Sequence, residues 1–319
     1  MTETLSLLAL AAIAVPHALA LDEVRPSVAA AMWLAALMLR AVIALFVAVF
    51  AIFYLPASAT FAALTHWCWA EVLPLITTHL HLALNGHDLG NVATLAPSLA
   101  LTLLALWTLI AASRAARTIG RSVRRAGIGS GPNGSVIVAG PDVVLAAAGI
   151  AAPRVVVSAG ALAVLDDHEL AAGLEHERAH IVRRHRYFLL VAELCRSIGR
   201  IVPGSRRAIR ELSFHLERDA DQWALQRTHD PLALASAICK AAAPSNEPAL
   251  VALAGSAGPR RVSQLLEGVR PGASGHGPMT LVATIMVTLA VALGALVPST
   301  ASAGLHRLSA DTGAHQCRA

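Results

Sequence analysis

Charged residues are scarce in this 319-residue chain, at 14% of the total, whereas 56% of the residues are hydrophobic. So few charges argue against an ordinary soluble domain of this length and predict that part of the chain lies in lipid. The charged residues gather in 114–275, and the flanks carry almost none. This asymmetry predicts a polar unit between apolar, membrane-embedded segments.

Several signature motifs are also missing. The four cysteines show no CxxC spacing, which argues against a cysteine zinc site or a redox motif. The glycine-rich segment 127–134 lacks the GK[ST] ending of a phosphate-binding loop and is predicted to be a flexible turn. No RNP, zinc-finger or helix-turn-helix pattern accompanies the net charge of +5, so no direct binding of nucleic acid is expected.

Four apolar stretches approach the roughly 20 residues that a helix needs to cross a bilayer. Arginines follow the third stretch directly, and this predicts that the chain beyond residue 113 is cytoplasmic, with the N-terminus, the loop 56–92 and the tail outside. The first stretch has an alternative as a cleaved signal peptide, although its start lacks the basic residues of such peptides. The four stretches are 4–21, 29–54, 93–113 and 279–298.

The predicted organisation therefore has three parts. Residues 1–113 form a membrane domain with three helices, 114–275 a cytoplasmic domain, and 276–319 a last membrane helix with a short external tail. The chain is expected in the plasma (inner) membrane as a multi-pass protein. Arg40 lies inside the second stretch, where a charge marks either a functional site or packing against another helix. Cys68 and Cys317 both fall outside in this topology, so a disulfide between them is an alternative to free thiols.

Short patterns within the polar unit predict a small sheet and two helices. The β-branched runs 136–138 and 154–157 are typical of paired strands. Asp166 and Asp167 supply the N-cap and first turn of a helix in which apolar residues recur at helical spacing. A second helix is expected over 208–227.

The first of these helices contains His176-Glu177-Arg178-Ala179-His180, an HExxH motif. Histidines at i and i+4 project from one helical face, so both imidazoles can reach one zinc ion, and the adjacent glutamate can contact the water bound to it. Glu177 is therefore the candidate general base of a peptidase. A chance match is the alternative, but the capped helix and a suitable downstream ligand make it the weaker one.

A zinc peptidase needs a third protein ligand. His185 lies nine residues after His176 and, on a continuous helix, points to the opposite face, so it is expected to be solvent-exposed or membrane-facing. Arg183 and Arg186 occupy positions where a metzincin needs glycine and histidine. Glu217 is the preferred third ligand, and Asp221, one helical turn later, is placed to accept the second N–H of a ligating histidine. A solvated acidic face is the alternative for this pair.

With HExxH followed by ExxxD, the chain resembles the membrane gluzincins, in particular the BlaR/MecR-type (M56-like) peptidases and their actinobacterial relatives, over about residues 95–230. The resemblance implies one Zn²⁺ per chain on the cytoplasmic side, with His176, His180 and Glu217 as ligands, Glu177 as base and Asp221 behind a ligand. No SxxK motif follows the last apolar stretch, so the penicillin sensor of that family is absent from this sequence.

These observations predict an α-helical membrane protein, with about four transmembrane helices, carrying a small α+β zincin-like cytoplasmic domain. The expected activity is a zinc metalloendopeptidase that cleaves a protein or peptide substrate at the membrane face in regulatory proteolysis, with a transcriptional repressor as the target that the resemblance suggests. The alternatives are a quality-control or maturation peptidase of the heat-shock or CAAX (M48-like) type, and a non-catalytic transducer held together by zinc.

Two details of such a site stay open at this level. Val155, Val156 and Val157 are candidates for the strand edge that receives the substrate, or they are ordinary core residues. The donor that stabilises the oxyanion is to be chosen among three side chains, namely Arg218, His215 and His185.

Overall fold

The computed structural model describes residues 21–53, 127–149, 152–242 and 258–267, together with positions 13, 14, 16, 17, 67, 99, 103, 106, 107, 109–111, 113 and 114. The predicted external loop 56–92 and the last apolar stretch 279–298 lie outside this part of the chain, apart from Trp67, as do Cys68 and Cys317. The first and third stretches are described only at isolated positions. The number of membrane helices and their orientation therefore stay predictions.

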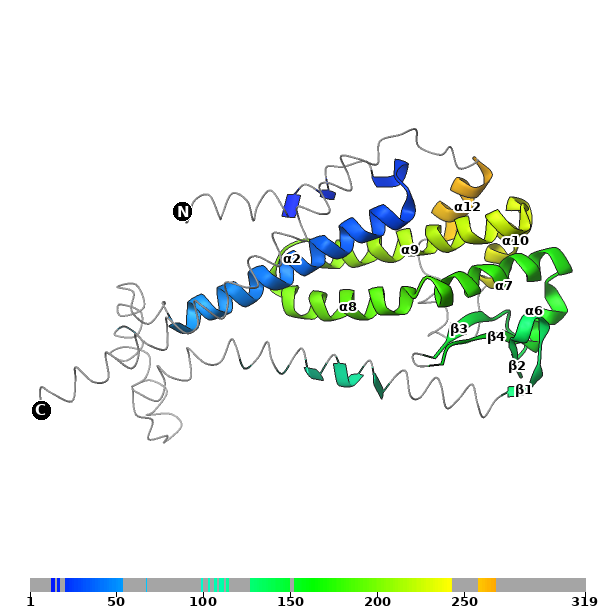
Figure 1. Cartoon of the computed structure of the whole chain (residues 1–319), viewed down its shortest axis with the longest axis horizontal. Helices are drawn as coiled ribbons and strands as arrows, with labels where there is room; N and C mark the ends of the chain where they lie inside the picture. Colours follow the sequence, from blue (N-terminus) through cyan, green and yellow to red (C-terminus); the bar gives the residue numbers. More distant parts are fainter. Residues whose placement is uncertain are drawn as a thin grey trace, which may run out of the picture.

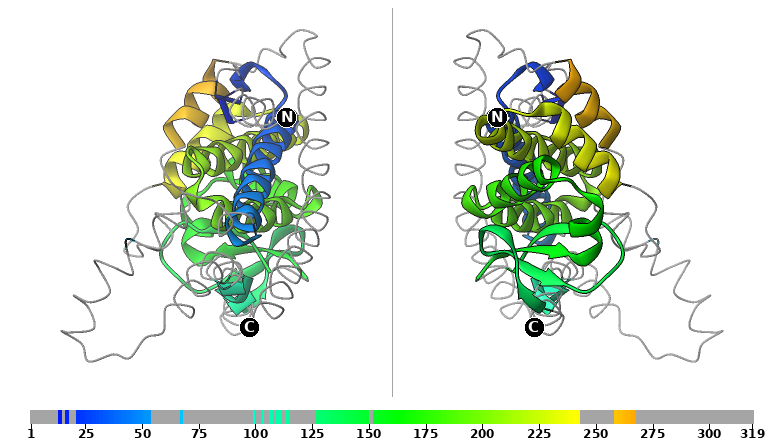
Figure 2. Two further views of the ribbon diagram at one scale, coloured as in Figure 1. Left: turned by 90° about the vertical axis from the view of Figure 1, so that its left-hand side faces the viewer. Right: turned by 90° about the vertical axis from the view of Figure 1, so that its right-hand side faces the viewer.

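Helices form most of the described structure, with a small sheet as a layer on one side of them (Figures 1 and 2). The long helices α2 (Pro26–Phe53), α8 (His185–Ile198) and α9 (Ser205–Thr228) pack together, and α7 (Asp167–Val182) lies between α9 and the sheet. Two shorter helices, α10 (Pro231–Ala241) and α12 (Gly258–Leu266), pack at the end of α9 that is distant from α8. The remaining elements are the 3₁₀ turns Leu21–Glu23, Pro132–Gly134 and Gly199–Ile201, and helix α6 (Ala159–Val164).

The sheet has the strand order β1-β2-β4-β3, with β1 at Gly127–Ser130, β2 at Val136–Val138, β3 at Leu145–Ala148 and β4 at Arg154–Ser158. The predicted pairing of the two β-branched runs is confirmed, since β2 and β4 are parallel neighbours. The prediction that 127–134 is only a turn is wrong for its first half, because β1 pairs antiparallel with β2 through its backbone. The second half does turn, with Asn133 at φ 53° and Gly134 at φ 76°.

Val155, Val156 and Val157 cannot offer the edge on which a substrate strand would pair. They belong to β4, which hydrogen-bonds to β2 on one side and to β3 on the other, so no backbone edge of β4 is free. Val157 is fully buried in the core between the sheet and α7. Among the described strands, β1 and β3 are the edges, and only β3 contacts α7.

Helix α2 is the one described helix that is long and apolar enough to cross a membrane, over Pro26–Ala48. However, 56% of its most apolar stretch is buried against the rest of the protein, and a core helix of a soluble protein passes the same test. Arg40, inside this helix, is fully buried and donates to the backbone carbonyls of Pro203, Ala36 and Ile13. Of the two roles predicted for this arginine, the structure shows the packing role, because its guanidinium ties α2 to the connection between α8 and α9.

The start of α7 confirms the predicted cap. Asp166 accepts from the backbone N–H of Glu169, and the Glu169 side chain accepts from the N–H of Asp166. The buried Glu169 also accepts from Lys240 at 2.6 Å and from Ser236 at 2.5 Å, both on α10. The hydrogen bonds from Lys240 and Ser236 lower the pKa of Glu169 from 4.5 to about 2. One carboxylate thus caps α7 and fastens it to α10.

We expect Glu169→Gln to lower the free energy of unfolding at neutral pH by about 1–3 kcal/mol, because a buried charged hydrogen-bond partner is lost. The lowered pKa stabilises the wild type above pH 4.5, and this contribution disappears as the pH falls towards 2. Denaturant unfolding at pH 6.5 and pH 3 should therefore show the difference between wild type and variant shrinking in acid. Asp167→Asn, at an exposed acid of the same first turn, is the matched control. An undiminished difference at pH 3 would contradict the role of the charge.

Candidate metal centre

Two packed helices bring together the three predicted ligands. Helix α7 supplies His176 and His180 from adjacent turns of one face, and α9 supplies Glu217 from the face that packs on α7. Among the described residues these three form the only group of acidic, histidine or cysteine side chains whose ligand atoms converge on one point, all within 4.8 Å of one another. The glutamate is 37 residues from His180, so this convergence is a product of helix packing.

The spacing of the three ligand atoms suits zinc. His176 Nε2 lies 3.2 Å from His180 Nε2 and 3.3 Å from Glu217 Oε2, and His180 Nε2 lies 3.5 Å from Glu217 Oε1. Ligands about 2.0–2.1 Å from a tetrahedral zinc ion are separated from one another by about 3.3–3.4 Å. Two nitrogens and one carboxylate oxygen at this separation are a donor set that Zn²⁺ prefers, and they leave a fourth position open.

The electrostatics of the group also indicate a cation site. Burial lowers the pKa of His176, but the hydrogen bonds that its ring donates to Asp221 and Glu217 outweigh this effect and raise the pKa to about 10. Burial and the neighbouring His176 lower the pKa of His180 to about 3. One proton is therefore held between two facing imidazoles and a carboxylate. A divalent ion held by all three residues would take the place of that proton and allow both rings to be neutral ligands.

Asp221 lies behind the first histidine. Its Oδ1 is 2.9 Å from His176 Nδ1, the nitrogen that faces away from the ligand group. A metal-bound imidazole normally donates its second N–H to such a carboxylate, which fixes the ring orientation. Asp221 is buried, and its pKa is lowered, against the effect of burial, by Arg261 and His176.

Glu177 follows His176 on α7 and contacts the edge strand. Its Oε2 accepts a hydrogen bond from the backbone N–H of Ala147 on β3 at 2.7 Å. With protein groups alone, burial raises the pKa of Glu177 from 4.5 to about 7, and a cation bound nearby lowers it. A carboxylate at this position can accept a proton from a water molecule and release it again, which is what a general base that later serves as an acid must do.

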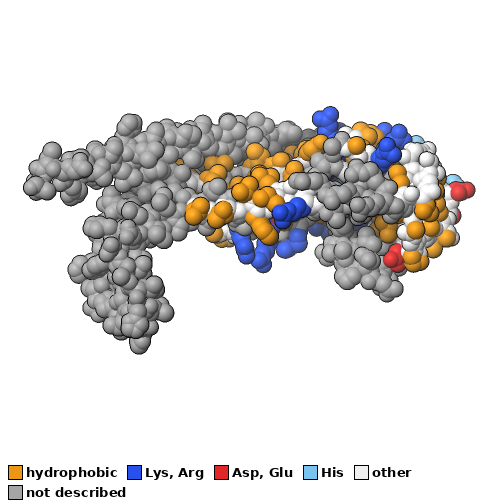
Figure 3. Space-filling view, turned by 90° about the horizontal axis from the view of Figure 1, so that it is seen from below, with side chains coloured by type: hydrophobic (Ala, Val, Ile, Leu, Met, Phe, Trp, Pro, Cys, Tyr) orange, Lys and Arg blue, Asp and Glu red, His pale blue; other side chains and the backbone are white. Residues whose placement is uncertain are grey.

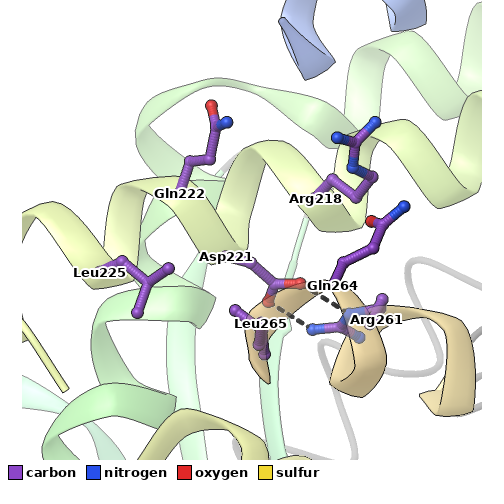
Figure 4. Close-up of a pocket in the computed structure, with 7 residues that line it drawn as sticks. All are labelled: Arg218, Asp221, Gln222, Leu225, Arg261, Gln264 and Leu265. Carbon is purple, nitrogen blue, oxygen red and sulfur yellow. Dashed lines mark hydrogen bonds and ion pairs between the residues drawn. The ribbon is translucent and has the colours of Figure 1, made fainter. Parts of the chain in front are cut away.

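Arg261 is a residue of the site that the sequence analysis did not find. It lies on α12, and its guanidinium donates to both oxygens of Asp221, at 2.6 and 2.9 Å (Figure 4). It also contacts Glu217 Oε2 at 2.8 Å. The two carboxylates hold the guanidinium charge in place, and its planar fork suits them geometrically. No motif spacing links an arginine 40 residues after Asp221 to this centre, so only the packing of α12 on α9 reveals it.

Two of the three predicted oxyanion donors, Arg218 and His215, are engaged with each other and with the N-terminal segment. Arg218 and His215 contact each other at 3.3 Å, and Arg218 also donates to the backbone carbonyl of Asp22. His215 is fully buried, and burial together with Arg218 lowers its pKa to about 3. Arg218 thus joins α9 to the N-terminal segment, and His215 contacts it within α9.

His185 is not exposed, contrary to the prediction from a continuous helix. Helix α7 ends at Val182, Arg184 adopts a left-handed conformation with φ 58°, and His185 begins the new helix α8. This break returns the imidazole to the metal group, where it is buried, with 3% of the residue exposed. It contacts the outer nitrogen of His180 and is therefore placed behind a ligand, away from the open coordination position.

Comparison with known proteins gives one match. The family model of Peptidase family M48, a family of zinc metallopeptidases, matches residues 110–204. This segment contains the HExxH motif and His185 and ends before Glu217. No curated protein and no solved structure matches the chain. The match supports a zinc metallopeptidase domain, and it lies in a family neighbouring the BlaR/MecR type, whose assignment is not confirmed.

Proposed function

We propose that this chain is a zinc metalloendopeptidase in which His176, His180 and Glu217 hold the metal. The observation that carries the proposal is the convergence of these ligand atoms at tetrahedral spacing, with Glu177 next to them. The match to the M48 family over the HExxH segment supports the same chemistry. A bound zinc ion would polarise the scissile carbonyl and lower the pKa of a water molecule beside it.

The residues of this chain then divide the remaining tasks. Glu177 takes a proton from the attacking water and delivers it to the leaving amine, and the Ala147 N–H keeps its carboxylate oriented. Asp221 fixes His176, and Arg261 offsets part of the negative charge of Asp221 and Glu217. Because Ala147 donates to Glu177, its N–H points away from β4 and towards the free edge of β3.

An extended peptide has one suitable place to bind. Among the described strands, β3 is the edge beside the base. The outward-facing backbone groups of Leu145–Ala148, apart from the Ala147 N–H that Glu177 accepts, can pair with a substrate backbone by strand addition. The edge of β3 therefore replaces β4 as the candidate strand for binding the substrate. Backbone pairing selects for extended, accessible segments of a protein substrate, so we favour an endopeptidase over an enzyme specific for free termini.

We propose that this cleavage occurs at the cytoplasmic face of the membrane. Two features support the location. Helix α2 has the length and composition of a membrane helix, and large apolar side chains of α8 are exposed, namely Tyr187, Leu189 and Val191. Hydrophobic side chains also gather on the face seen in Figure 3, with lysines and arginines along its margin. Apolar surface bordered by basic residues is typical of contact with anionic lipid.

The biological role we propose is regulatory proteolysis of a repressor or a membrane regulator, following the resemblance of HExxH and ExxxD to the BlaR/MecR-type peptidases. The M48 match is the observation that keeps a maturation or quality-control peptidase as the second candidate. A non-catalytic transducer stabilised by zinc is the alternative of another class, and a base beside the ligands has no use in it.

The decisive experiment is metal removal and return on the full chain, purified in detergent or nanodiscs. We expect one zinc per chain, cleavage of casein or of the chain itself, loss of that cleavage with a zinc chelator, and recovery when zinc but not magnesium is added. Metal content by atomic absorption and cleavage by gel are the two readouts. A zinc-free chain that does not take up added zinc would overturn the metal site, and a zinc-loaded but inert chain would favour the transducer.

A further inference from the structure

The mechanism above leaves His185 and Asp219 without a task, although both are buried next to the metal group. His185 Nδ1 lies 2.9 Å from His180 Nδ1, and His185 Nε2 lies 3.1 Å from Asp219 Oδ2. Only 3% of His185 and 4% of Asp219 is exposed. Helix α9 therefore reaches both histidines of the HExxH motif, through Asp221 to the first and through Asp219 and His185 to the second.

One arrangement of protons satisfies this chain of contacts. If His180 binds a metal through Nε2, it carries its proton on Nδ1 and donates it to His185 Nδ1. His185 must then carry its own proton on Nε2, which donates to Asp219 Oδ2. The other oxygen of Asp219 accepts from Arg183 at 3.0 Å. When His180 is a ligand, both ring nitrogens of His180 and His185 and both oxygens of Asp219 have a partner. The direction of each hydrogen bond then sets the direction of the next.

The backbone shows why His185 can occupy this position. A continuous helix would place it about 140° around the axis from His180, because five residues rotate by about 100° each. The left-handed Arg184 ends α7 and starts α8, and it returns the ring to the metal side. A left-handed conformation is unfavourable for an arginine, and here it serves to bring an imidazole against a metal ligand.

We propose that His185 and Asp219 are positioning residues, which orient His180 and fix its tautomer for zinc binding by a relayed hydrogen bond. The proposal rests on the zinc site proposed above. The two histidine ligands then differ in how they are oriented. His176 is supported directly by a carboxylate, and His180 is supported through an intervening imidazole. His185 and Asp219 touch neither substrate nor metal, so their effect must appear in metal binding.

The test measures the zinc dissociation constant of the full chain by competition with a chelator, together with the visible spectrum of the cobalt(II)-substituted protein. His185→Phe keeps a ring of similar size without an acceptor, and we expect it to weaken zinc binding by about 10–100-fold and to shift the cobalt spectrum. His185→Asn retains an acceptor close to the position of Nδ1 and should recover part of this loss. Asp219→Asn keeps the hydrogen bond without the charge, so its loss should be smaller than that of His185→Phe.

His168→Phe is the matched control, since this histidine lies at the exposed start of α7, with 82% of its side chain accessible, and faces Asp230 at 3.8 Å. It should bind zinc as the wild type does. Zinc affinity and cobalt spectra unchanged in both His185→Phe and Asp219→Asn would overturn the proposal, even if the variants melt at lower temperature. If His185→Phe does not fold, Asp219→Asn and His185→Asn decide by the same readouts. Failure of the wild type to bind zinc would instead count against the zinc site itself.

Discussion

Replacing Glu177 with glutamine should lower kcat/KM for peptide cleavage by about 10²–10⁴-fold, the usual contribution of a positioned general base. Glutamine has almost the same shape and can still accept from the Ala147 N–H, but it cannot take up a proton. Glu177 is not one of the converging ligands, so zinc content should stay at one per chain. Loss of cleavage with zinc retained would identify Glu177 as a base and not as a metal ligand.

Glu175→Gln is the control for this variant. Glu175 is also on α7, two residues earlier, but its carboxylate faces Arg227 at 3.2 Å and Arg178 at 3.5 Å and not the metal group. Cleavage by this variant should be close to that of the wild type. If Glu177→Gln cleaved casein at the wild-type rate, the proposal that this carboxylate transfers the proton would be wrong. If it preserved the protein's function in cells, the transducer would become the better interpretation.

Replacing Glu217 with alanine should remove zinc and activity together. The two histidines would then form a site of two ligands from one helix, and Arg261 would lose one of its two carboxylate partners and bring positive charge close to the metal position. We expect at least about 100-fold weaker zinc binding, since a ligand is lost and not only a supporting group. Zinc titration with a fluorescent indicator gives the affinity, and the cleavage assay should be repeated at saturating zinc.

Glu211→Ala is a suitable comparison on the same helix, because its carboxylate contacts Arg260 at 3.3 Å and not the ligand group. It should retain one zinc and wild-type cleavage. If Glu217→Ala kept zinc at wild-type affinity, another residue would have to serve as third ligand. Arg261→Gln would then be informative, since without a role for Glu217 any effect of the guanidinium on zinc would have to act through Asp221.

The sequence by itself determined the parts of the site that lie within one element. The i, i+4 spacing of His176 and His180, the Asp166 cap and the strand character of the two β-branched runs depend on helix and strand geometry, which neighbouring residues set. The ExxxD spacing likewise placed Glu217 and Asp221 on one face of α9. For these residues, local geometry was enough to predict which side chains share a face.

Only the tertiary structure decided which elements meet. Arg261 reaches the centre because α12 packs on α10 beside α9. Strand β4 has no free edge because β2 and β3 both pair with it. Arg40 is held by the connection between α8 and α9, where the Pro203 carbonyl accepts from its guanidinium. His185 is the clearest case, since one left-handed residue at Arg184 overrides the periodicity that predicted an exposed ring. Contacts between elements depend on packing and on single backbone dihedrals, and neither is encoded in residue spacing.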